Sequence, residues 1–177
     1  MIYNPGDDSY LLKEQVLKYS KGRKVLDIGS GSGIQAEAAI KAGAKKVLAV
    51  DIDDKVVKTL KERGLRSKKS NLFSNIEGKF DLIIFNPPYL PYDKMEDAES
   101  SRITSGGRRG DEIIIGFWED VNKYLNKGGI ILIVLSSLTP KRRILKILKE
   151  KKLGKEVLSE KKLFMEKIEV WKIEAKV

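Results

Sequence analysis

The 177-residue chain contains neither cysteine nor histidine. Without cysteine it can form no disulfide bond and no thiolate metal site. Without histidine it has no imidazole for a serine–histidine or cysteine–histidine pair. Any catalysis must therefore proceed without a thiol or an imidazole, and we expect no metal site. The chain also lacks an apolar run near the roughly 20 residues that a membrane-spanning helix needs.

The N-terminus lacks the charged and apolar regions of a signal peptide, so we expect a cytoplasmic protein with no membrane partner. Positive charge is abundant instead: 35 Lys and Arg against 25 Asp and Glu give a formal net charge of +10 at pH 7. Such an excess favours acidic partners, such as nucleic acid or an acidic protein, without choosing between them. The length and the 41% of hydrophobic residues are typical of a single folded domain, residues 1–177.

Short apolar segments alternate with amphipathic ones, which predicts an α/β fold with a mostly parallel sheet and helices on both faces. The last two strands are joined without a long crossover, so the C-terminal strand should run antiparallel. We expect residues 7–9 to cap the first helix, Gly128 and Gly129 to end the fourth, and Thr139 and Pro140 to begin the fifth. The expected strands are 24–28, 47–50, 65–70, 80–85, 130–135, 155–158 and 168–175, and the expected helices are 9–19, a segment ending near 41, 54–63, 111–126 and 140–151.

A glycine-rich segment follows the first expected strand. Gly29, Gly31 and Gly33 stand where strand gives way to helix, and glycines there let the backbone approach a ligand at the helix N-terminus. Ile34 occupies the position where an NAD-binding loop would have its third glycine, so the spacing is wrong for a dinucleotide. Asp27 would repel a pyrophosphate but would favour a cationic cofactor. The alternative is that these residues only form turns and cap helices, as in any doubly wound domain.

The Asn-Pro-Pro-Tyr segment 86–89 follows an apolar strand at the carboxyl edge of the expected sheet, where open α/β sheets bind ligands. The prolines donate no backbone hydrogen bond, so carbonyl acceptors are left exposed, while Asn86 adds a side-chain carbonyl. The segment therefore suits a planar NH2 group. Its two N–H groups can donate hydrogen bonds to the oxygens of Asn86 and Pro87 while Tyr89 stacks on its plane. Such a site acts by positioning and needs no strong base. The alternative is a proline-rich turn without a function.

The two motifs together resemble class I S-adenosylmethionine-dependent methyltransferases, whose first strand carries an acidic residue followed by G-x-G-x-G. This resemblance implies S-adenosylmethionine as cofactor and a seven-stranded Rossmann-like methyltransferase sheet. The Asn-Pro-Pro-Tyr segment is similar to that of amino-methyltransferases acting on planar nitrogens, either in nucleic-acid adenine or in release-factor glutamine. Y-N-P-G-D-D-S-Y-L-L at 3–12, N-L-F at 71–73 and G-G-R-R-G at 106–110 resemble the release-factor glutamine methyltransferases, in their short single-domain archaeal and eukaryotic branch.

The resemblance assigns roles position by position. It implies that the glycine loop holds the methionine moiety, that Asp51 binds the ribose hydroxyls and that Asn71 lies near the adenine. The expected catalytic residues are Asn86, Pro87 and Tyr89, and the expected acceptor-binding residues are Asn86, Pro88, Tyr89 and Arg108. The expected cofactor-binding residues are Pro5, Asp8, Ser9, Asp27, Gly29, Ser30, Gly31, Gly33, Asp51, Ile52, Asn71, Leu72 and Asn86.

The resemblance also implies an activity and a partner. The activity is methylation of the glutamine in the GGQ motif of a peptide chain release factor, and the partner is a small zinc-binding activator subunit at the edge of the third strand. That strand, 65–70, is basic, so an acidic partner could dock there, although edge lysines also guard against aggregation. The basic helix after Pro140 and the arginines of the long loop could bind RNA, or could form an ordinary solvated surface. The alternatives are an RNA adenine or guanine amino-methyltransferase, a protein lysine methyltransferase and a non-catalytic cofactor-binding subunit.

Overall fold

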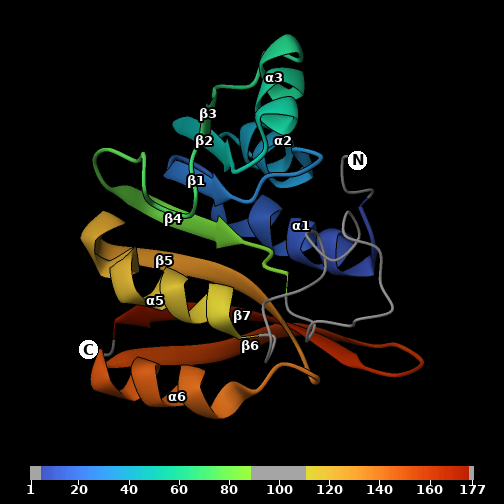
Figure 1. The fold of residues 1–177 in the computed structure, drawn as a ribbon, viewed down its shortest axis with the longest axis vertical. Helices are drawn as coiled ribbons and strands as arrows, with labels where there is room; N and C mark the ends of the chain where they lie inside the picture. Colours follow the sequence, from blue (N-terminus) through green and yellow to red (C-terminus); the bar gives the residue numbers. More distant parts are fainter. Residues whose placement is uncertain (1–4, 89–110, 176–177) are drawn as a thin grey trace.

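A computed structural model of the protein describes residues 5–88 and 111–175. These residues form a seven-stranded sheet in the order β3-β2-β1-β4-β5-β7-β6, with helices on both faces (Figure 1). The expected α/β architecture is thus confirmed. In the described part of the chain, no helix is both long and apolar enough to cross a membrane. The strands are β1 (Lys24–Ile28), β2 (Lys46–Asp51), β3 (Ser67–Lys69), β4 (Phe80–Phe85), β5 (Leu125–Ser136), β6 (Leu153–Lys162) and β7 (Lys167–Ala175), and the helices are α1 (Asp7–Tyr19), α2 (Ile34–Lys41), α3 (Asp54–Glu62), α5 (Glu112–Tyr124) and α6 (Lys141–Glu150).

The strand directions place several strand ends at one edge of the sheet. The five strands from β3 to β5 are parallel, whereas β7 runs antiparallel to both of its neighbours, β5 and β6. The carboxyl ends of β1, β2 and β4, at Ile28, Asp51 and Phe85, therefore lie together. Because β1 sits between β2 and β4, the strand order reverses at β1, which is where open α/β sheets bind ligands.

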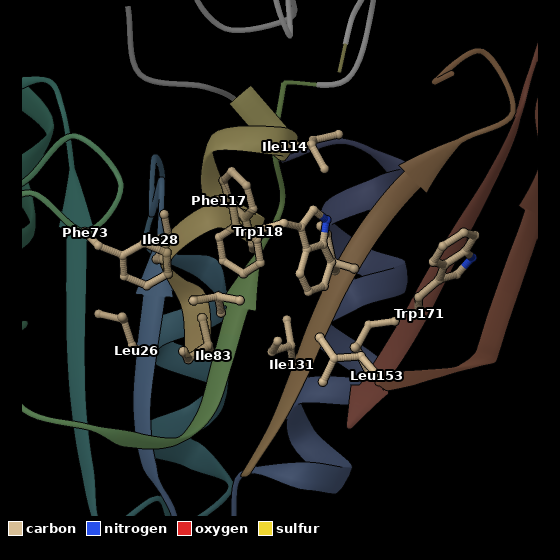
Figure 2. Packing of buried hydrophobic residues seen from close by; sticks show 14 of the residues in the cluster. Leu26, Ile28, Phe73, Ile83, Ile114, Phe117, Trp118, Ile131, Leu153 and Trp171 are labelled. Carbon is tan, nitrogen blue, oxygen red and sulfur yellow. The ribbon is translucent and has the colours of Figure 1, made fainter. Parts of the chain in front are cut away.

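Both faces of the sheet are buried, because alternate residues of a strand point to opposite faces. Leu26 and Ile28 of β1 belong to a cluster with Phe117 and Trp118 of α5 (Figure 2), and two residues of α6 belong to the same cluster. On the other face, the side chain of Val25 packs with residues of α1 and α2. Burial on both sides explains why β4 is almost continuously apolar in sequence and why β1 has apolar residues on both of its faces.

The helix expected at 111–126 ends earlier than predicted. α5 stops at Tyr124 and β5 begins at the next residue, so Gly128 and Gly129 lie inside a strand and do not end the helix. The register between β4 and β5 shifts in this stretch, because Phe80 pairs with Leu125 but Leu82 pairs with Ile130. Gly128 lies among the extra residues of β5 and has a φ of +74°. A glycine pair after an amphipathic segment is therefore a bulge within a strand here, which accommodates the extra residues.

The predicted caps of the first and last helices are also wrong. α1 begins after Gly6 and α6 begins after Pro140, in both cases without a side-chain hydrogen bond to the cap. Residues 7–9 already lie inside α1, where Asp8 Oδ1 accepts a hydrogen bond from the Ser9 backbone N–H at 2.7 Å. Acidic residues in a first turn still favour the helix through its dipole. The second oxygen of Asp8 is left to contact another part of the fold.

Gly33 should tolerate alanine poorly, because it combines a left-handed backbone with a close approach to α3. Its φ is +79°, and an added Cβ would lie 2.7 Å from Leu60 Cδ2 and 3.1 Å from Leu65 Cδ1. Gly22 has a similar φ of +71° but nothing within 4 Å of an added Cβ. The Gly22→Ala variant therefore measures only the free-energy cost of a side chain on a left-handed backbone. We expect Gly33→Ala to lower the free energy of unfolding by about 1–3 kcal/mol more than Gly22→Ala, measured by urea denaturation. Equal losses in the two variants would contradict this explanation.

Candidate functional site

The loop between β1 and α2 turns on three left-handed glycines. Gly29, Gly31 and Gly33 have φ values of +65°, +48° and +79°, which residues with a side chain rarely adopt. The Ser30 N–H donates a hydrogen bond to the Val50 carbonyl at 3.0 Å, which ties the loop to the end of β2. The loop therefore lies at the carboxyl edge of the sheet with few side chains to obstruct a ligand.

Asp51, the last residue of β2, is half-buried and holds two backbone segments. Its Oδ2 accepts a hydrogen bond from the Gly31 N–H and its Oδ1 from the Asp53 N–H, both at 3.0 Å. Each carboxylate oxygen can accept a second hydrogen bond. Asp51 can therefore order the glycine loop and bind hydroxyl groups of a ligand at the same time. The next residue, Ile52, is 61% exposed and adds an apolar surface beside it.

Asp27 is a carboxyl group buried two residues before the glycine loop. Its Oδ2 has no hydrogen-bond partner among the residues that the structure describes. Burial raises the pKa of Asp27 to about 7, with the negative charge of Asp51 adding to the rise and the Ser30 hydroxyl opposing it. A carboxyl group with this pKa changes its ionisation readily near neutral pH, so a positively charged ligand nearby would favour its anionic form.

Asn86, directly after β4, is held by the first turn of α1. Its Nδ2 donates a hydrogen bond to Asp8 Oδ2 at 3.0 Å and lies 3.4 Å from Ser9 Oγ. A carboxylate can only accept, so this contact determines which end of the amide carries the nitrogen. The Oδ1 of Asn86 is buried and has no partner within residues 5–88 and 111–175. That oxygen is free to accept a hydrogen bond from a ligand.

Gln35 belongs to the same site, although the sequence analysis did not identify it. It is buried at the start of α2, and its Nε2 donates a hydrogen bond to the Ser9 backbone carbonyl at 2.8 Å. Gln35 thereby fixes the first turn of α1 relative to the helix that follows the glycine loop. The only signal in the sequence is one polar residue beside Ala36, Ala38 and Ala39, which form the buried face of that helix.

Some of the other expected site residues are described by the structure, and the rest lie outside the described residues. Pro5 lies half-buried just before α1, Pro87 is buried, and Pro88 is half-buried. Asn71 follows β3 at the same sheet edge and is exposed, whereas Leu72, at a φ of +49°, packs against the main hydrophobic core. Tyr89, Arg108 and the segment 106–110 lie outside the described residues, so their expected roles stay predictions.

Comparison with known proteins gives a family match and named relatives. The family model of the methyltransferase small domain matches residues 7–165. A protein of Methanocaldococcus jannaschii, provisionally named a protein N5-glutamine methyltransferase, is 40% identical over 156 residues, which are 84% of this chain and 79% of that protein. The ribosomal protein L11 methyltransferase of Caldicellulosiruptor saccharolyticus is 47% identical over 87 residues, which are 45% of this chain and 29% of that protein.

A solved structure is similar over nearly the whole chain. It is the Mtq2–Trm112 complex of E. cuniculi, which is responsible for methylation of the eRF1 translation termination factor. The similarity has a TM-score of 0.80 and 25% sequence identity, and it covers 98% of this chain and 98% of that one.

Replacing Asp51 by alanine should weaken binding of the expected cofactor. The change removes the carboxylate that would accept the ribose hydroxyls and also releases the Gly31 N–H of the loop. We expect the dissociation constant for S-adenosylhomocysteine to rise by at least about tenfold, measured by calorimetry. Asp54→Ala is the matched control, because Asp54 is an exposed aspartate on the adjoining α3 that pairs with Lys69. An unaltered affinity in Asp51→Ala would count against the ribose assignment.

Proposed function

This chain belongs to the methyltransferase small domain family, and we propose that it transfers a methyl group from S-adenosylmethionine to the glutamine side-chain amide of a peptide chain release factor. The observation that carries the proposal is the buried Oδ1 of Asn86 at the carboxyl edge of the sheet, which has no hydrogen-bond partner in the described part of the chain. A catalytic role uses this oxygen, whereas a non-catalytic cofactor-binding subunit would leave it without a function.

The residues at this edge fit S-adenosylmethionine by their chemistry. When bound, the cofactor supplies an electrophilic methyl group and carries positive charge. Asp27 can ionise beside that charge, and its Oδ2 has no competing partner among the described residues. Asp51 keeps acceptor capacity for two ribose hydroxyls. From their places in the fold, we expect Ile52 to offer an apolar surface to the adenine. We expect Asn71 to offer it a polar group.

Asn86 positions the methyl acceptor. Because Asp8 holds its Nδ2, its Oδ1 can accept one N–H of the substrate NH2 group, and the Pro87 carbonyl can accept the other. When both N–H groups donate hydrogen bonds to these oxygens, the electron density on the amide nitrogen rises, although much of it is otherwise delocalised into the amide's own carbonyl. With the cofactor bound, the bond from nitrogen to the methyl carbon would form as the methyl–sulfur bond breaks, which would leave S-adenosylhomocysteine as the product, and one amide proton would pass to solvent. Rate then depends on positioning and electrostatics, without an imidazole or a thiol.

A planar amide fits this arrangement better than a lysine acceptor. A lysine ammonium has no lone pair until it loses a proton, and its ordinary pKa is about 10.4. The carboxylate nearest to Asn86 is Asp8, which already accepts hydrogen bonds from Asn86 and Ser9. Removal of the ammonium proton would therefore need a further base, and within residues 5–88 and 111–175 the hydrogen bonds of Asn86 reach no carboxylate other than Asp8.

An RNA base also carries a planar NH2 group, so RNA is the second candidate for the acceptor. Two of the cations of α6 are already paired within the protein. Lys141 pairs with Glu169 and Arg143 pairs with Asp111, both at 3.0 Å, so these cations are partly neutralised within the protein. Phosphate binding needs cations that can pair with the nucleic acid. The protein acceptor is the better supported of the two, because the related proteins are named for methylation of protein glutamine and of a translation termination factor.

We expect a small partner subunit, zinc-binding as the family resemblance implies, to bind at the edge strand β3. The related Mtq2 forms a complex with Trm112. β3 has only three residues, and among the described strands it pairs with β2 alone, so one side of it can accept an added strand. Lys68 lies 4.0 Å from Glu77 and Lys69 pairs with Asp54, so the positive charge of this edge is partly compensated. Backbone pairing is therefore the main attraction that we propose.

The acceptor is tested by transfer of a tritiated methyl group from S-adenosylmethionine. The candidates are a release factor, a variant of it with GGA in place of GGQ, and bulk RNA, each with and without the candidate partner subunit. Label in the release factor but not in its GGA variant supports the proposal. Label in RNA that survives protease treatment and falls steeply with salt would overturn it.

Asn86→Ala should abolish turnover while leaving cofactor binding nearly intact, because it removes the oxygen that holds the acceptor. Asp8→Asn should lower turnover less, since an amide at position 8 still contacts Asn86 but no longer dictates its orientation. Initial rates and calorimetric cofactor affinities, both measured against Asn122→Ala on the exposed surface of α5, separate the two effects. Unchanged turnover in Asn86→Ala would reject the proposed role.

Cofactor affinity should depend on pH through Asp27. Its pKa of about 7 leaves the carboxyl group mostly neutral at pH 6 and mostly ionised at pH 8. A cationic ligand favours the ionised form, so affinity for S-adenosylmethionine should rise by up to about tenfold from pH 6 to pH 8. The isosteric Asp27→Asn variant should show a weak, pH-independent affinity by the same titration. A wild-type affinity that stays constant over this range would exclude the linkage.

A further inference from the structure

The hairpin that joins β6 to β7 carries two strongly exposed apolar side chains at its tip. Phe164 is 99% exposed and Met165 is 78% exposed, more than any other large apolar residue in the described part of the chain. Leu138, which precedes α6, is 48% exposed. We refer to Leu138, Phe164 and Met165 as the hairpin patch. Apolar groups gathered in solvent are typical of a surface that binds a partner.

The tip is exposed but firmly held. The Leu163 N–H donates a hydrogen bond to the Glu166 carbonyl at 2.7 Å, which closes the turn. The Ser137 N–H donates to the Lys167 carbonyl at 2.7 Å, and the Lys167 N–H donates back to Ser137 Oγ at 2.9 Å. These bonds tie the hairpin to the segment that contains Leu138. A surface ordered in this way loses little conformational entropy when a partner binds.

The hairpin patch lies at the same edge of the sheet as the methyl-transfer site. Ile168 at the start of β7 pairs with Ser136 at the end of β5, so the tip extends beyond the carboxyl ends of the parallel strands (Figure 1). Lys161 of β6 forms an ion pair at 2.6 Å with Asp7, the residue before the one that holds Asn86. The patch is thus joined to the acceptor site through the first turn of α1.

We propose that the hairpin patch docks the protein acceptor itself, as a second contact beyond the glutamine that enters the site. This inference rests on the proposed function. A glycine–glycine–glutamine loop offers one side chain, so recognition of the correct protein needs contacts elsewhere. The exposed Lys162 beside the tip favours an apolar surface of the acceptor that is bordered by acidic side chains. An RNA ligand fits the patch less well, because Phe164 is the one aromatic side chain of the three, and methionine and leucine are poor stacking platforms for bases.

The test is the double variant Phe164→Ser/Met165→Ser, whose residues are too exposed to support the core. We expect the KM for the release factor to rise by about tenfold, with kcat at saturation, cofactor affinity and the thermal unfolding midpoint unchanged. Ile40→Ser is the matched control, because Ile40 is 52% exposed on α2, which lies well apart from the β6–β7 hairpin (Figure 1). It should leave the KM unaltered.

The outcomes separate the two proposals. If the wild-type protein methylates the release factor and the double variant keeps the same KM, the docking role is wrong and the proposed function stands. If the wild-type protein methylates only RNA, the proposed function fails, and the docking inference fails with it. An equal rise of the KM in Ile40→Ser would also contradict the docking role of the hairpin patch. Loss of any exposed apolar side chain would then be enough to raise the KM.

Discussion

An asparagine amide has one end that donates hydrogen bonds and one that accepts, and its use in a site depends on which end is left free. Here the bond from Asn86 Nδ2 to Asp8 Oδ2 makes that choice and leaves the oxygen available. Asp8 lies on α1, which is fixed to α2 by the bond between Gln35 and Ser9. The acceptor site at the end of β4 therefore depends on the packing of the first helix. The proposed chemistry requires α1 and the sheet to be assembled together.

Much of this fold could be predicted from the sequence, because burial on both faces of the sheet leaves a strong pattern. The bounds of β1 and β4 agree with the expected 24–28 and 80–85, since β4 is apolar except for Asp81 and β1 is apolar except for Lys24 and Asp27. The grouping of Asp27, Asp51 and Asn86 at one edge followed from the parallel order of the strands. Gly128 and Gly129 misled the prediction because a strand bulge and a helix end both favour glycine.

What the sequence could not provide are the contacts between distant segments. Asp8 and Asn86 are 78 residues apart, and Ser9 and Gln35 are 26 apart, so no local periodicity connects them. Asp8 and Ser9 were expected to line the cofactor cleft, but their contact with the acceptor-binding amide required the three-dimensional arrangement. The raised pKa of Asp27 likewise follows from its burial, which depends on α1 and α2 covering that face of the sheet.

The position of β7 has a consequence for the synthesis of the chain. β7 is the last strand in sequence, yet it lies between β5 and β6 and buries Val170, Trp171 and Ile173. A nascent chain that has reached only β6 cannot pair that strand with its neighbour, and the outer side of β5 stays uncovered. The sheet can therefore close only after residues up to Ala175 have emerged from the ribosome. Until then the unfinished half of the sheet is a target for chaperones and for aggregation.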